Sequence, residues 1–247
     1  MTIVLVHGVP ETVAVWDPLR ERLGRSDVVT VGLPGFGTPR PEGFGATKEE
    51  YVAWLVGEVE RQAQAGPVDL VGHDWGGGLV VRLVSTRPEL VRSWVTDAAG
   101  IGDISFEWHD FAKIWQTPGA GEEFFAQQAA QTAEERGEVL AAMFAVPRER
   151  AIEMAGWADE VMADSILRLY RSAVDVGREW GPDFHDIPAP GLVLVPSDDP
   201  FLSAESAREG AQRAGAGVAE MPGVGHWWML QDPALGARVL GDFWSRP

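Results

Sequence analysis

Short apolar runs alternate with amphipathic stretches along most of the chain. Thr47 and Glu50 have the spacing of a capping box, and Pro88 stops a later helical pattern. The expected helices are Thr47–Gln64, Gly77–Arg87, Ala204–Ala214 and Pro233–Trp244. Six apolar runs have the length of buried strands, namely Ile3–Val6, Val28–Val31, Val68–Val71, Trp94–Thr96, Leu192–Val195 and Val218–Glu220. This alternation predicts an α/β fold with a six-stranded parallel sheet covered by helices.

One interval breaks the alternation. No strand pattern occurs from Asp103 to Gly181, where helical segments carry large side chains: Trp108, Trp115, Phe124, Phe125, Met143, Phe144, Trp157 and Tyr170. We therefore predict a core formed by residues 1–102 and 182–247, with a helical cap at 103–181. Most of these side chains are expected to pack inside the cap, and a few to line a cavity beneath it.

Composition excludes several classes of binding partner and site. A chain of 247 residues with a net charge of -17 repels phosphate backbones, so we expect no nucleic-acid partner. The absence of cysteine excludes disulfides and thiolate metal sites. No apolar run has the length of a membrane span, and the N-terminal one lacks the basic flank of a signal peptide. The expectation is a soluble cytoplasmic protein without a membrane partner, and a homodimer is left open.

The most specific motif is Gly72-His73-Asp74-Trp75-Gly76, which follows a predicted strand and opens a predicted helix. That context is typical of a nucleophile elbow, a sharp turn that small residues must flank. The central residue is an aspartate, whose ionised carboxylate can attack an electrophilic carbon and form an ester. The alternative is a glycine-rich turn in which Asp74 only caps the helix.

A second motif, His7-Gly8-Val9-Pro10, follows the first predicted strand. The loop in this position supplies one donor of an oxyanion hole, and the residue after the nucleophile supplies the other. The expected donors are therefore the backbone N–H groups of Val9 and Trp75. His7 is expected to brace the loop.

The candidate base is His226, which lies between the last predicted strand and the last predicted helix. Its position after the nucleophile and an acid agrees with the chain order of such triads. Asp199 follows the fifth predicted strand and is the preferred acid, with Asp198 and then Asp97 as alternatives. A loop histidine held only by local hydrogen bonds is the structural alternative for His226.

Together these motifs resemble the α/β-hydrolase superfamily, in particular its epoxide hydrolase and haloalkane dehalogenase branch. The resemblance rests on His7-Gly8-Val9-Pro10, on Gly72-His73-Asp74-Trp75-Gly76-Gly77 and on Gly225-His226-Trp227, and it extends from Ile3 to Trp244. It implies an α/β-hydrolase fold with a helical cap. The family's usual first two strands have no counterpart here, which agrees with a sheet of six strands.

The resemblance implies hydrolysis of a small apolar epoxide to a vicinal diol, without a metal or cofactor. Epoxide hydrolases of this branch open the ring with two cap tyrosines, whereas this chain contains only Tyr51 and Tyr170. Tyr170 is the expected ring-opening acid, and Tyr51 belongs to a helix of the core. A second donor would be Trp108, Trp115 or His109, and Trp75, Trp108 and Trp115 are the expected substrate-binding residues.

Two other functions use the same residues. A haloalkane dehalogenase would hold the leaving halide with Trp75 and a second donor such as Trp115, although Val9 stands where many members have asparagine. Gly77 and Gly78 replace the arginines that fluoroacetate-type members use, which disfavours a small anionic substrate. A ligand-binding protein without turnover is the third possibility, and the intact set of Asp74, His226 and Asp199 argues against it.

Overall fold

A computed structural model describes residues 2–245 of the chain. Its centre is a parallel sheet with the strand order β2-β1-β3-β4-β5-β6, which confirms the predicted six-stranded parallel sheet. The strands are β1 (Ile3–Val6), β2 (Val28–Val31), β3 (Val68–Gly72), β4 (Val91–Thr96), β5 (Gly191–Pro196) and β6 (Gly217–Met221).

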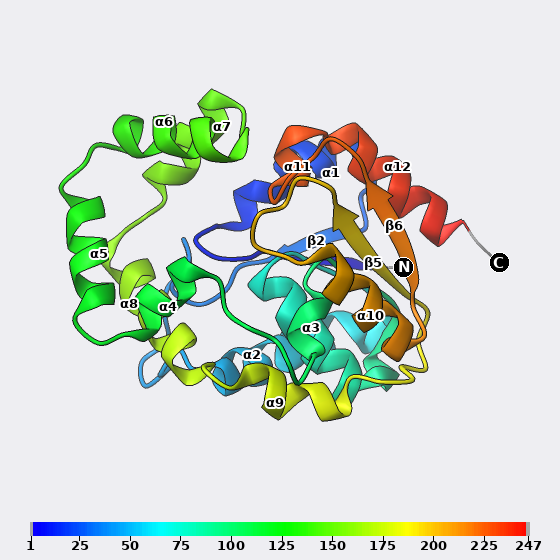
Figure 1. Ribbon diagram of the computed structural model, residues 1–247. Coiled ribbons are helices and arrows are strands. Elements are labelled where there is room, and N and C mark those ends of the chain that lie inside the picture. The colour runs from blue at the N-terminus through cyan, green and yellow to red at the C-terminus, as the bar shows by residue number, and fades with distance from the viewer. Residues whose placement is uncertain (1, 246–247) are drawn as a thin grey trace.

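Helices cover both faces of this sheet because alternate strand residues point in opposite directions. Val4 and Val6 join one buried cluster, whereas Ile3 and Leu5 join the other. The first cluster lies under α2 (Lys48–Gln62), α3 (Trp75–Thr86) and α10 (Ala204–Ala214). The second lies under α1 (Asp17–Leu23), α11 (Trp228–Gln231) and α12 (Pro233–Trp244), on the opposite side of the sheet in Figure 1.

The interval without strand patterns is helical. Between β4 and β5 the chain forms α4 (Asp110–Gln116), α5 (Ala120–Ala129), α6 (Ala133–Phe144), α7 (Arg148–Gly156), α8 (Glu160–Ser172) and α9 (Val176–Trp180). Figure 1 shows α5, α6 and α7 standing to one side of the sheet, while α9 returns beneath it. We call α4–α9 the helical insertion.

The ends of several elements follow from local sequence. The predicted capping box is present: Thr47 accepts a hydrogen bond from the Glu50 N–H, and the Glu50 side chain accepts one from the Thr47 N–H. α10 and α12 span the predicted residues. α3 begins two residues earlier than predicted because it starts directly after Asp74. Among residues 2–245, no helix combines the length and apolar character that crossing a membrane requires.

Glycine 76 allows α3 to approach β1, and its replacement should destabilise the protein. A Cβ at Gly76 would lie 2.3 Å from the Val6 carbonyl oxygen, whereas a Cβ at Gly57, inside α2, would lie 3.8 Å from its nearest neighbour. We expect Gly76→Ala to lower the free energy of unfolding by about 1–3 kcal/mol. Gly57→Ala should instead raise it by up to about 1 kcal/mol. Urea denaturation of both variants checks this, and equal effects would contradict it.

Candidate active site

The turn between β3 and α3 presents Asp74 at the carboxyl end of the sheet. Its backbone has φ 50° and ψ -120°, a conformation that residues with a Cβ rarely adopt. Glycines make this turn possible: a Cβ at Gly72 would lie 2.4 Å from the Gly76 carbonyl oxygen. The predicted requirement for small flanking residues therefore has a direct steric cause.

The loop after β1 lies against the Asp74 side chain. The Val9 N–H donates to Asp74 Oδ1 at 2.8 Å, and a Cβ on Gly8 would collide with the Asp74 side chain. His7 braces this loop from within the core: the Leu33 N–H donates to its Nε2, and its Nδ1 lies 2.7 Å from the Gly8 carbonyl oxygen. Trp75 is the first residue of α3, where N–H groups have no partner within the helix.

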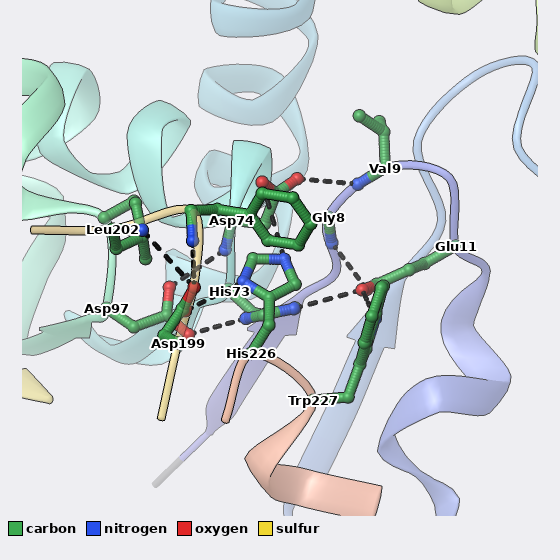
Figure 2. A network of polar contacts seen from close by, with 12 residues as sticks. Gly8, Val9, Glu11, His73, Asp74, Asp97, Asp199, Leu202, His226 and Trp227 are labelled. Atoms are coloured by element: carbon green, nitrogen blue, oxygen red, sulfur yellow. Dashed lines mark hydrogen bonds and ion pairs between the residues drawn. The ribbon is translucent and has the colours of Figure 1, made fainter. Parts of the chain in front are cut away.

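His226 contacts both carboxylates that the sequence placed with it. Its Nδ1 is 2.9 Å from Asp199 Oδ2, and its Nε2 is 3.8 Å from Asp74 Oδ2. Figure 2 shows His226 between these two residues. An Nδ1–H that donates to Asp199 leaves the Nε2 lone pair facing Asp74 when the ring is neutral. The arrangement suits a base that acts next to the Asp74 carboxyl group.

The two alternative acids occupy other positions. Asp198 is exposed and accepts a hydrogen bond from the Ser197 hydroxyl. Asp97 is buried but contacts His73, not His226. Asp199 is in turn held by backbone N–H groups of Phe201 and Leu202, which donate to its other oxygen. Among the three candidates, only Asp199 meets the imidazole of His226.

Burial and neighbouring charge change the titration of this pair. Burial raises the pKa of Asp74 to about 6, although the positive charges of His226 and His73 lower it. For His226, burial lowers the pKa, but the charge of Asp199 and its hydrogen bond outweigh that effect and raise it. The Asp74 carboxylate is therefore a stronger base than an exposed aspartate, yet it is ionised at neutral pH.

Asp74 and His226 open onto a cavity of about 1070 Å³ below the helical insertion. Tyr170 of α8 lines the same cavity and is 1% exposed. Most of the exposed lining is apolar, and its rings are those of His109, Phe111, Trp115, Phe124, Phe125, Phe144, Phe201 and Trp227. Such a lining favours an apolar ligand with few polar contacts.

The predicted binding tryptophans divide into two groups. Trp115 lines the cavity, whereas Trp75 and Trp108 do not belong to its lining among the described residues. The rings of Trp75 and Trp108 stack on each other with centroids 5.5 Å apart, and both rings pack against Tyr170. The Trp108 indole N–H donates to the Ala173 carbonyl oxygen, so this group is already paired.

Sequence reasoning missed a buried charged cluster behind the nucleophile. His73 lies between two carboxylates: its Nδ1 is 2.6 Å from Asp97 Oδ2, and its Nε2 is 3.0 Å from Glu11 Oε1 (Figure 2). All three side chains are fully or almost fully buried. Glu11, His73 and His226 have the donor spacing of a metal site, but both ring nitrogens of His73 already face carboxylates.

Comparison with known proteins gives the family. The chain matches the profile described as the alpha/beta hydrolase family over residues 3–239. It is 24% identical to the (E)-2-((N-methylformamido)methylene)succinate hydrolase of Acinetobacter baylyi, over 88% of this chain and 80% of that protein. It is 26% identical to the 2-hydroxy-6-oxo-2,4-heptadienoate hydrolase of Pseudomonas putida, over 98% of this chain and 88% of that protein.

Solved structures share the fold. A haloalkane dehalogenase, DbeA of Bradyrhizobium elkani, superimposes with a TM-score of 0.75 and covers 98% of this chain and 89% of its own. Its sequence identity is 20%, so the likeness concerns the fold alone.

The raised pKa of Asp74 can be measured directly. We expect its carboxyl group to titrate near pH 6, because burial disfavours the charged form. Carbon-13 NMR of aspartate-labelled protein would follow it, with Asp74→Asn to assign the signal. Asp27 is an internal control, since its hydrogen bond with Arg25 lowers its pKa to about 2. A midpoint for Asp74 below pH 4.5 would contradict the electrostatic picture of the site.

Proposed function

The chain belongs to the alpha/beta hydrolase family, and we propose that it hydrolyses an apolar epoxide to a vicinal diol through an ester on Asp74. One observation carries the proposal: a carboxylate on a strained elbow, an imidazole base and a buried phenol meet in one apolar cavity. The curated relatives support hydrolysis in general. The aspartate at the elbow supports attack on a saturated carbon, with formation of an ester.

In the first step a carboxylate oxygen of Asp74 attacks an epoxide carbon. The bond between that carbon and the ring oxygen breaks, and the oxygen takes a proton from Tyr170. Burial and the nearby charge of Asp74 raise the pKa of Tyr170, so its phenol keeps its proton until the ring opens. The product of this step is a hydroxyalkyl ester of Asp74.

In the second step His226 removes a proton from water, and the water oxygen attacks the ester carbonyl carbon. Asp199 holds the imidazole through Nδ1 and stabilises the imidazolium that forms. The Val9 N–H, already directed at Asp74 Oδ1, and the Trp75 N–H would stabilise the oxyanion. When the tetrahedral intermediate collapses, its bond to the alkyl oxygen breaks and that oxygen takes the proton held by His226, which releases the diol. The acid proton left on Asp74 passes to the Tyr170 phenolate, and the Asp74 carboxylate is restored.

Two side chains remain as candidates for the second donor to the epoxide oxygen. Trp108 is not one of them, because its indole N–H already donates to the Ala173 carbonyl oxygen. His109 accepts the Ala112 N–H at Nδ1, and burial lowers its pKa to about 4, so its neutral ring carries the proton on Nε2. His109 and Trp115 both line the cavity, and the Trp115 indole N–H is buried without a partner.

A specific observation also favours haloalkane dehalogenation as a second candidate. The indole N–H group of Trp115 is buried without a hydrogen-bond partner, and this residue lines the cavity beside Tyr170. An unpaired buried donor is costly, and a leaving halide would satisfy it. Product analysis with matched epoxide and haloalkane panels distinguishes the functions, since one yields diols and the other releases halide.

The phenol of Tyr170 separates the two functions further. We expect Tyr170→Phe to slow ester formation from an epoxide about 10²–10⁴-fold, the usual contribution of an acid catalyst. Tyr51→Phe is the matched control, because its hydroxyl donates to the Pro34 carbonyl oxygen in the core. Single-turnover kinetics measures both. A near-normal rate with Tyr170→Phe would contradict a ring-opening role for this residue.

Replacing His226 should separate the two half-reactions. Asp74 attacks as a carboxylate and needs no base to remove a proton from it, so His226→Gln should still form the ester at pH 7.5, but water would lack a base. We expect consumption of about one equivalent of substrate per active site, with the added mass on the peptide that contains Asp74. Mass spectrometry reads this out, and Asp74→Asn is the control that forms no adduct. Multiple turnovers by His226→Gln would refute the two-step route.

A further inference from the structure

The hydrogen bonds around His73 fix its protonation state. Both ring nitrogens face carboxylate oxygens, at 2.6 Å from Asp97 and 3.0 Å from Glu11. A neutral imidazole has a single N–H, so one of these contacts would set a nitrogen lone pair against a carboxylate oxygen. A ring that donates from both nitrogens is an imidazolium.

A neutral His73 would require a proton on one of the two carboxyl groups, and the hydrogen bonds of both groups oppose this. Glu11 accepts N–H groups on both oxygens, from the Trp227 indole and from the Gly8 backbone. Asp97 likewise accepts the Trp228 indole N–H on one oxygen and the Asp74 backbone N–H on the other. Protonation of either carboxyl group would weaken one of these bonds, because a hydroxyl oxygen accepts poorly.

We propose that His73 is a permanent buried imidazolium that positions the nucleophile elbow and the oxyanion loop, and keeps Asp74 ionised and His226 neutral between turnovers. The inference rests on the proposed roles of Asp74 as nucleophile and His226 as base. His73 itself touches neither substrate nor reacting atoms and acts through its neighbours.

The positioning role follows from the origin of the three residues. Glu11 follows β1, His73 follows β3 and Asp97 follows β4, and these strands are adjacent in the sheet. Through Glu11 the imidazolium holds the Gly8 N–H of the oxyanion loop, and through Asp97 it holds the Asp74 N–H of the elbow. One cation thus ties together the two loops that must meet at the ester carbonyl.

The electrostatic role follows from proximity. The rings of His73 and His226 lie 4.6 Å apart between centroids, so a charge on one opposes a charge on the other. Burial raises the pKa of Asp74, and the charge of His73 is among the effects that lower it again. The same charge opposes the effect of Asp199, which raises the pKa of His226.

The titratable groups around His73 come from several elements and do not cancel this effect. His7 is neutral, because its Nε2 accepts the Leu33 N–H and burial lowers its pKa. The remaining groups that face His73 are carboxylates and the base itself, namely Glu11, Asp74, Asp97, Asp199 and His226. His73 is therefore the cation that balances a buried, mainly anionic neighbourhood.

Nitrogen-15 NMR of the histidine rings tests, without any substrate, both the charge of His73 and its effect on the pKa of His226. In the wild-type protein we expect both nitrogens of His73 to keep their protons from pH 5 to about 9. In His73→Gln the pKa of His226 should rise by about one unit or more, because a like charge at this distance is lost. His185→Gln changes an exposed ring outside the site and should leave His226 unaffected.

Glu11→Gln should shift the pKa of His226 in the opposite direction, and it tests the proposal if His73→Gln does not fold. Loss of a negative charge should lower the pKa of His226, whereas loosened packing alone would not reverse the direction between the two variants. A His73 ring that loses a proton near its ordinary pKa, or an unchanged His226 pKa in His73→Gln, would overturn the proposal. Failure to find a substrate would count only against the proposed function.

Where a substrate is found, the pH dependence of ester hydrolysis gives a kinetic reading. The acid limb reports loss of the neutral base, so His73→Gln should move it upward by the same amount as the pKa of His226. A lower rate with an unmoved limb would show that His73 serves structure alone.

Discussion

The site depends on holding one residue in a conformation that its own side chain disfavours. The backbone of Asp74 has φ 50°, and such strain persists only where the surroundings determine it from several directions. Gly72 and Gly76 remove the steric obstacle, Asp97 accepts the Asp74 N–H, and the Val9 N–H meets the Asp74 side chain. The strand order β1-β3-β4 makes this convergence possible, since each strand delivers one of these groups at the same edge.

The position of the site sets its chemistry. In an open parallel sheet, loops at the carboxyl ends of the strands form the binding crevice. The helical insertion between β4 and β5 covers that crevice with aromatic side chains. Removing water strengthens each charge interaction inside but also penalises the Asp74 carboxylate, and this burial raises its pKa to about 6. Donors and cations close to Asp74 must offset that penalty.

The sequence predicted the sheet and the contacts of His226 better than it predicted the surroundings of the nucleophile. Apolar runs and turn residues located the six strands to within three residues, because buried parallel strands have a strong pattern. The helices of the insertion were predicted only as a group, since short helices acquire their bounds from tertiary packing. Asp97 was weighed only as a triad acid, although its partner is His73.

Glu11 and His73 were missed for a related reason. Both stand in loops at strand ends, where polar residues are ordinary, and no spacing in the sequence distinguishes a buried charge from a solvated one. The signal lies in three dimensions: three ionisable side chains from separate strands, all buried, can remain only if they pair with one another. The division into core and cap, and the roles given to the site residues, stay predictions.

The cluster also bears on why a carboxylate suits this elbow. A serine nucleophile would need His226 to become an imidazolium in both half-reactions, whereas an aspartate is ionised beforehand and needs the base only for water. An imidazolium of His73 with its ring 4.6 Å from that of His226 makes each protonation of His226 more costly. The same charge favours the anionic form of Asp74. A buried cation at this position therefore favours the ionised form that a carboxylate nucleophile needs, and it opposes the protonation of His226 only in the second step.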